Sequence, residues 1–199
     1  GPVSLIRGHL TSEHLRQVQD RVPSVHAITY LRHPTDRLIS NFLWRHANHR
    51  NSPQKFASPG SFEEFCKLKS SNHMSDLLVG PCESTDEAMD KLKNRFWFVG
   101  LTEYYHVCQA ILLNLLGSSY RIRKRQNITQ SPPAERELIT QQGLEIAHAG
   151  MEIDFAIYHF FHQQWSAKIN DAIEFTMRVA SQPNLKRPQQ PKSEKLQAA

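Results

Sequence analysis

The feature that most constrains the fold is a short apolar run, residues 25–31, which follows Pro23 and stops before Pro34. Its β-branched and aromatic side chains predict a buried strand. From Thr35 to about His49 apolar residues recur at helical spacing, and Pro34 suits the first helical position, where its missing N–H would have no partner. The sequence therefore predicts a strand, a tight turn and a helix.

The same alternation continues along the chain. A second buried strand is expected at residues 96–100 and a short one at 120–122, and Gly117 is expected to end the helix before it. Ser61 and Glu64 have the spacing of a capping box. The other expected helices cover about residues 61–68, 85–94, 102–116, 132–149 and 153–180, with a loop at 51–60. Strands that alternate with helices indicate an α/β domain with a mainly parallel sheet.

The length of 199 residues is enough for one globular domain, and 39% hydrophobic residues can supply its core. We expect no membrane segment, because no apolar run approaches the roughly 18 residues needed to cross a bilayer, and no signal peptide is visible. A net charge of +5 favours an anionic ligand such as a nucleotide, a nucleic acid or a polyanionic sugar. We find no DNA- or RNA-binding motif, so specific nucleic-acid binding is not expected.

The two ends of the chain are expected to lie outside the domain. Gly1 and Pro2 resemble the pair that removal of an expression tag leaves, so the domain is predicted to cover residues 3–180. Residues 181–199 are rich in Pro, Gln and Lys, which predicts a disordered basic tail. The three cysteines have no C-x-x-C spacing, so they are interpreted as ordinary thiols with at most one disulfide, and the redox compartment stays open.

Arg32 is the first candidate site residue. It follows the predicted strand at its carboxyl end, where open α/β sheets bind ligands, and the helix that begins near Pro34 offers free N–H groups to an anion. At ~100° per residue, Arg37, Ser40 and Trp44 share one face of that helix, opposite the apolar residues. The alternative is that Arg32 and Arg37 form structural ion pairs at a strand–helix corner.

Residues 28–42 (ITYLRHPTDRLISNF) resemble the 3′-phosphate-binding motif of sulfotransferases, especially the Golgi-type carbohydrate enzymes and their bacterial relatives. In that family an Arg at the strand end and a Ser eight residues later bind the 3′-phosphate of the donor, which is the spacing of Arg32 and Ser40. Further segments resemble family motifs in the same order, although Ser75-Asp76 stands where Thr-Arg is usual. They are Gly8-His9-Leu10 and residues 72–80, 98–103, 126–129 and 154–158.

The resemblance implies a P-loop-NTPase-like three-layer fold and a PAPS-dependent sulfotransferase, with 3′-phosphoadenosine 5′-phosphosulfate (PAPS) as co-substrate and no metal. The acceptor is an unidentified hydroxyl, with a carbohydrate favoured. His9 would take the acceptor proton, with a structural histidine as the alternative. Arg32, Ser40 and Arg37 would bind the donor, although a structural carboxylate is the favoured partner of Arg37.

One family element is not visible, since nothing before Gly8 resembles the amino-terminal strand and Lys-x-Gly-Thr loop that bind the 5′-phosphosulfate. We therefore expect inefficient transfer by these 199 residues. The alternative function is a non-catalytic module of the same fold that binds a nucleotide or an anionic glycan. Oligomeric state stays open, and a bacterial cytoplasm is slightly favoured over the Golgi lumen.

Three other features have ordinary structural explanations. Thr102 is expected to cap a helix, although a contact with adenine is possible within the family. The pairs His46/His49 and His159/His162 are three residues apart on predicted helices, and surface histidines are favoured over a zinc site. The basic residues at 121–125 are interpreted as a solvated loop.

Overall fold

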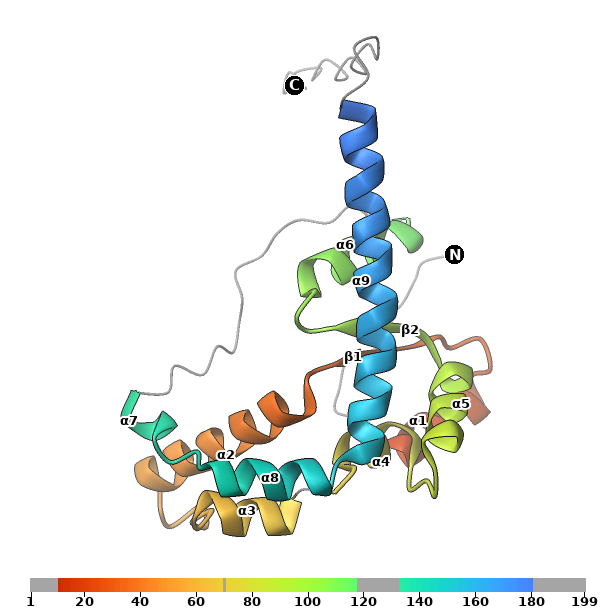
Figure 1. Cartoon of the computed structure of the whole chain (residues 1–199). Coiled ribbons are helices and arrows are strands. Elements are labelled where there is room, and N and C mark those ends of the chain that lie inside the picture. The colour runs from red at the N-terminus through yellow and green to blue at the C-terminus, as the bar shows by residue number, and fades with distance from the viewer. Residues whose placement is uncertain (1–10, 70, 118–132, 181–199) are drawn as a thin grey trace, which may run out of the picture. The chain divides into compact units, whose positions relative to one another are not determined.

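The computed structural model describes residues 11–69, 71–117 and 133–180 (Figure 1). The chain divides into two compact units, Gly1–Gln163 and Gln164–Ala199. The first unit contains both strands and most of the helices, and the candidate site residues fall in it. The second unit contains the carboxyl-terminal part of α9, the helix Glu152–Ala180.

The sheet is formed by β1 (Ala27–Leu31) and β2 (Phe96–Leu101), which pair in parallel. The register runs from Ala27 opposite Phe96 to Leu31 opposite Leu101, with an irregularity after Ala27. The N–H of Thr102 extends the pairing by donating to the carbonyl oxygen of Leu31 at 2.9 Å. Both strands and their parallel direction are confirmed. Because the described residues hold a sheet of two strands, the mixed α/β class is confirmed and the three-layer sulfotransferase fold stays a prediction.

Helices α2 (Pro34–Asn51), α3 (Phe62–Lys69) and α8 (Gln141–Ala149) enclose an apolar core. The rings of Phe62 and Phe65 lie 5.1 and 5.4 Å from that of Phe42, and α3 lies beside α8 (Figure 1). Gly143 permits this close approach, because a Cβ atom there would collide with the Phe62 ring. Burial of these side chains on one face of each helix is the main stabilising contribution in this region.

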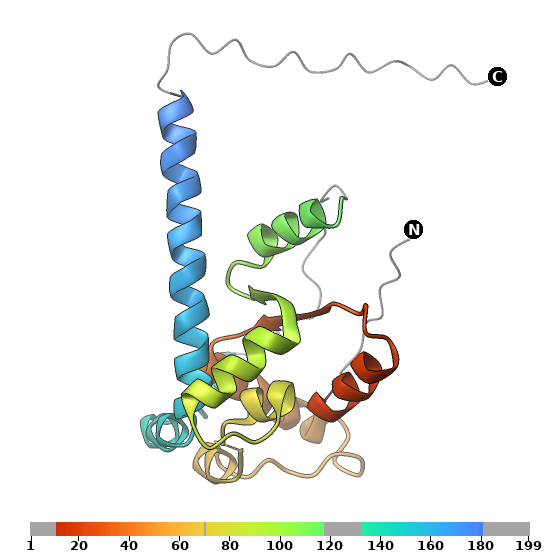
Figure 2. The ribbon, with the colours of Figure 1, turned by 90° about the vertical axis from the view of Figure 1, so that its right-hand side faces the viewer.

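Two predicted helix starts are confirmed by their caps. Ser61 Oγ accepts from the N–H of Glu64 and the Glu64 carboxylate accepts from the N–H of Ser61, which is the predicted capping box of α3. Ser84 caps α5 (Thr85–Arg95), which passes directly into β2 (Figure 2). The structure also contains α1 (Ser12–Arg21) and α4 (His73–Val79), which the sequence analysis did not predict.

Two helix boundaries were predicted wrongly. The helix expected over residues 132–149 is two helices, α7 (Pro133–Arg136) and α8, because Thr140 begins α8 by accepting the N–H of Gly143. Helix α6 (Tyr105–Leu115) begins three residues later than expected, because Thr102 is held in the strand pairing and does not cap it. Gly117 does follow the end of α6, with a φ of 69° that favours glycine. The strand predicted at 120–122 lies outside the described residues.

The predicted carboxyl-terminal helix is confirmed as α9. In its part that belongs to the second unit, Lys168 Nζ lies 5.4 Å from the centre of the Trp165 ring. Over the described residues, every helix is too short or too polar to cross a membrane. Cys66, Cys82 and Cys108 all fall in the described ranges, and no disulfide joins any two of them.

Candidate functional site

The predicted donor-binding residues lie around the end of β1. Arg32 follows the last residue of the strand and its side chain is exposed, whereas Arg37 and Ser40 lie on α2 and are half-buried. Within the described ranges, the side chains of Arg32 and Ser40 form no hydrogen bond or ion pair, so both are available to a ligand. His9, the predicted catalytic base, lies outside the described residues.

A carboxylate of the chain itself lies at the amino end of α2. Glu103 follows β2 closely, and its Oε1 accepts the N–H of His33 at 3.0 Å. A negative charge at this position is favourable because the amino end of a helix carries a partial positive charge. From the sequence alone, these N–H groups are expected to be free for an external anion. A phosphate near α2 would depend mainly on Arg32 and Ser40, because Glu103 already occupies the N–H of His33.

Tyr158 joins α9 to this corner. The side chain is buried near Glu103; burial raises its pKa to about 12, and the negative charge of Glu103 adds to the effect. The hydroxyl therefore keeps its proton at neutral pH. The His33 ring meets the Phe155 and Tyr158 rings edge-on, with centroids 5.6 and 5.1 Å away. These contacts fix the turn between β1 and α2 against α9.

The first turns of α4 and α9 cap each other. Asn72 Oδ1 accepts the N–H groups of Ile153 and Asp154, at 2.9 and 3.2 Å. In return, the Asp154 carboxylate accepts the N–H groups of Met74 and Ser75, both at 2.8 Å. Four N–H groups that helices leave without internal partners are thereby satisfied. We call this arrangement the α4–α9 junction.

Arg37 interacts electrostatically with the α4–α9 junction. Burial lowers its pKa, and the charge of Asp154 opposes that effect. For Asp154, burial raises the pKa, while the two backbone N–H groups and Arg37 oppose the rise. The pKa of His73 is lowered by burial and then by the charge of Arg37. This environment favours a structural role for Arg37, and its assignment to the donor phosphate stays a prediction.

One histidine of each pair in the sequence analysis is hydrogen-bonded to a neighbouring protein group. His162 Nε2 lies 3.1 Å from the hydroxyl of Tyr104, and His49 Nδ1 lies 2.7 Å from the carbonyl oxygen of Phe56. His46 Nδ1 lies 3.9 Å from Glu135 Oε1. In residues 11–69, 71–117 and 133–180, no three His, Cys, Asp or Glu side chains are grouped closely enough to hold a metal ion.

Sequence reasoning missed the contacts that organise this region. Asn72, Asp154 and Tyr158 belonged to segments that resemble family motifs, but no partners were assigned to them. Glu103 was expected only at a helix start, with no role in the site. A signal was present, since an Asn or Asp next to a helix start often caps N–H groups. The pattern could not reveal that each of the two residues caps the other's helix.

Comparisons of the chain with protein-family models, with curated proteins and with solved structures return no match. The functional conclusion therefore depends on the residues themselves and on their contacts.

Proposed function

We propose that the protein is a sulfotransferase that moves a sulfuryl group from PAPS to a carbohydrate hydroxyl, with Arg32 and Ser40 binding the 3′-phosphate of the donor. The observation that carries the proposal is that separate segments resembling sulfotransferase motifs contact one another around the end of the two strands.

Three contacts make up this convergence. The segment around Arg32 bonds to the segment at 98–103 through the Leu31–Thr102 and His33–Glu103 hydrogen bonds. The segment at 72–80 bonds to that at 154–158 through the α4–α9 junction. The rings of Phe155 and Tyr158 then link the last segment back to His33, beside Arg32. The carboxyl ends of parallel strands are where α/β proteins bind ligands, which supports a site here.

The chemistry of the available side chains suits a phosphate. The exposed guanidinium of Arg32 can donate two parallel hydrogen bonds to phosphate oxygens, and the hydroxyl of Ser40 can donate a third. In the proposed transfer, the acceptor oxygen bonds to sulfur while the bond from sulfur to the 5′-phosphate oxygen breaks. His9 takes the acceptor proton, and adenosine 3′,5′-bisphosphate leaves.

Titration with adenosine 3′,5′-bisphosphate by calorimetry tests the proposal. We expect Arg32→Ala to weaken binding by roughly 10- to 100-fold, because a charge-assisted hydrogen bond contributes about 1.5–3 kcal/mol. Ser40→Ala should weaken it less. Adenosine 5′-phosphate lacks the group that Arg32 binds, so Arg32→Ala should change its affinity little.

Arg21→Ala is the matched control, because Arg21 is an exposed arginine at the end of α1. The proposal is wrong if the wild-type protein does not prefer the 3′-phosphorylated nucleotide, or if the Arg21 and Arg32 variants bind it equally. Inefficient transfer is expected of these 199 residues under both the enzyme and the non-catalytic alternative, so the experiment reads nucleotide binding and not turnover.

A further inference from the structure

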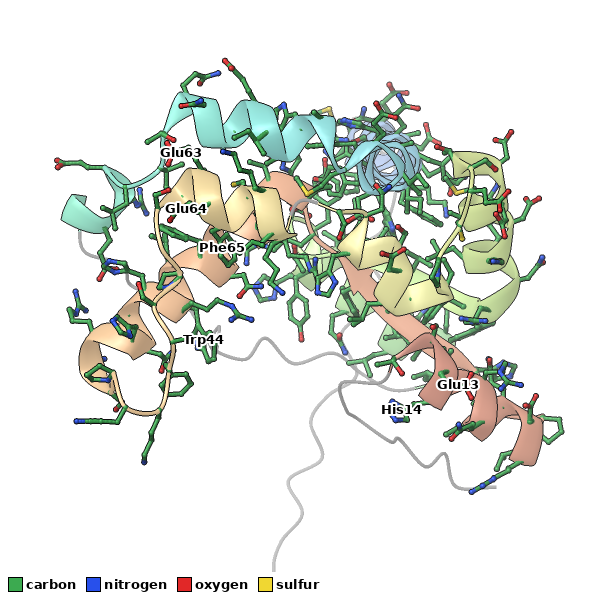
Figure 3. The ribbon with its side chains drawn as sticks, turned by 90° about the horizontal axis from the view of Figure 1, so that it is seen from below. Glu13, His14, Trp44, Glu63, Glu64 and Phe65 are labelled. Carbon is green, nitrogen blue, oxygen red and sulfur yellow. The ribbon has the colours of Figure 1, made fainter. Side chains whose placement is uncertain are left out.

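An exposed tryptophan lies one helical turn beyond Ser40. Trp44 is 48% exposed and projects from α2 on the side away from α8 (Figure 3). The Phe56 ring meets it edge-on, with centroids 5.9 Å apart and planes at 84°. Phe56 is itself fixed, because its carbonyl oxygen lies 2.7 Å from His49 Nδ1. The indole is therefore supported from one side while much of it faces solvent, which suits stacking against a ligand ring.

Polar side chains neighbour Trp44 along α2. Arg45 Nε donates to Asn41 Oδ1 at 3.0 Å, and Asn48 Nδ2 donates to the carbonyl oxygen of Trp44 at 2.7 Å. These two bonds do not use the terminal N–H groups of Arg45, the amide N–H groups of Asn41 or the Oδ1 of Asn48. Donors and an acceptor beside an aromatic ring are a combination that suits sugar hydroxyls.

The chain segment that carries Trp44 and Phe56 has charge of one sign. Between Asp36 and Glu63 the sequence contains no acidic residue, whereas it contains four Arg or Lys residues. Arg50 is paired with Glu135 of α7 at 2.5 Å, but Arg45 and Lys55 are exposed. A ligand on this surface would meet positive charge, so the surface is complementary to an anionic ligand.

We propose that Trp44, Phe56, Arg45 and Lys55 form a binding surface for an anionic oligosaccharide. A pyranose ring lies on the indole of Trp44, and its carboxylate or sulfate groups bind Arg45 and Lys55. Trp44 follows Ser40 by about 6 Å along α2, so a saccharide held there would lie beside the bound donor. That the saccharide is the sulfuryl acceptor rests on the proposed function, whereas its binding to Trp44 can be measured independently. If an adenine base stacked on Trp44 instead, the exposed Arg45 and Lys55 would have no anionic group to bind.

The test measures binding of a heparin-derived hexasaccharide at fixed ionic strength, with neutral maltohexaose for comparison. We expect Trp44→Ala to weaken hexasaccharide binding about tenfold or more. An aromatic side chain that becomes covered by the ligand often supplies much of the binding free energy. Trp44→Phe should have an intermediate effect on binding. Because it keeps an aromatic ring, this variant also distinguishes loss of the binding surface from misfolding. Arg45→Ala should weaken binding several-fold and reduce its dependence on salt, and maltohexaose should bind more weakly than the hexasaccharide.

The matched controls are Trp97→Ala and Lys67→Ala. Trp97 is 45% exposed on β2, and Lys67 is exposed on α3, so both should leave binding unchanged. The inference is overturned if Trp44→Ala and Trp97→Ala lose the same affinity for the hexasaccharide. It is also overturned if neither Trp44→Ala nor Arg45→Ala loses affinity. So does weaker binding of adenosine 3′,5′-bisphosphate to Trp44→Ala with unchanged hexasaccharide binding, because Trp44 would then stack on the base. Failure of the nucleotide to bind the wild-type protein would reject the donor site alone.

Discussion

Two buried carboxylates of the chain have opposite surroundings. Asp154 is 1% exposed, and each of its oxygens accepts a backbone N–H. Glu135 is 5% exposed; one oxygen binds the half-exposed Arg50, and the other is buried without a hydrogen-bond partner in the described structure. Asp154 satisfies two N–H groups at the start of α4, whereas Glu135 leaves part of its desolvation uncompensated.

The difference shows where buried charge contributes to stability. Backbone N–H groups at a helix start have no partner within the helix. Removing the side chain that accepts their hydrogen bonds leaves them buried and unpaired, which lowers the free energy of unfolding. A pair of side chains can be replaced together by apolar groups, often with little loss. We therefore expect the α4–α9 junction to be necessary for the fold and the Glu135–Arg50 pair to be replaceable.

Asp154→Ala should have the largest effect. Two buried N–H groups would lose their acceptor, and the free energy of unfolding should fall by about 3 kcal/mol. Urea denaturation followed by circular dichroism measures the change. Asp90→Ala is the control, because Asp90 is exposed on α5, and it should stay within about 0.5 kcal/mol of the wild type. Equal effects of the two substitutions would contradict the role assigned to the junction.

Substitutions at the second carboxylate should have smaller effects. Arg50 is half-exposed, so Arg50→Ala removes mainly the charged hydrogen bond to Glu135, and the free energy of unfolding should fall by about 1–2 kcal/mol. Glu135→Leu removes the uncompensated charge and should change it by less than about 1 kcal/mol. The expected difference between the two carboxylates is wrong if Glu135→Leu destabilises the protein as much as Asp154→Ala does in the same denaturation experiment.

Tyr158 offers a smaller, pH-dependent test beside the junction. An unfolded tyrosine loses its proton near the ordinary pKa of 10.0, whereas the folded one keeps it up to about 12. The folded state thus holds more protons in that window, so the contribution of Tyr158 to stability falls as pH rises from 10 towards 12. Tyr158→Phe should lose this part of the pH dependence in urea denaturation. The difference in phenol absorbance between the wild type and Tyr158→Phe can also be followed as pH rises. A midpoint near 10 would contradict the raised pKa of Tyr158.

Local patterns predicted the elements around the candidate site well. The apolar run before Pro34 gave β1, the helical spacing after it gave α2, and Ser61 with Glu64 gave the capping box. Each of these signals is contained within a few residues. The parallel direction of the strands followed from the helices between them, because a parallel connection requires a long crossover.

Long-range partners could not be predicted in this way. Glu103 bonds to His33 across 70 residues, and Asp154 bonds to Met74 across 80. No periodicity connects residues so far apart. Helix α1 was missed for a different reason, since its mean hydropathy is low and it contains few apolar residues, of which Leu15 is buried. The break before α8 was missed because Thr140 was not recognised as a helix cap.

The separation between Asn72 and the start of α9 also has a kinetic consequence. The caps of α4 and α9 depend on residues about 80 positions apart, and the strand pairing likewise joins distant segments. Contacts between distant segments require loop closure before they contribute stability, and they slow folding. We therefore expect the amides of Met74, Ser75 and Asp154 to acquire protection from hydrogen exchange late in refolding, after the short-range helices have formed.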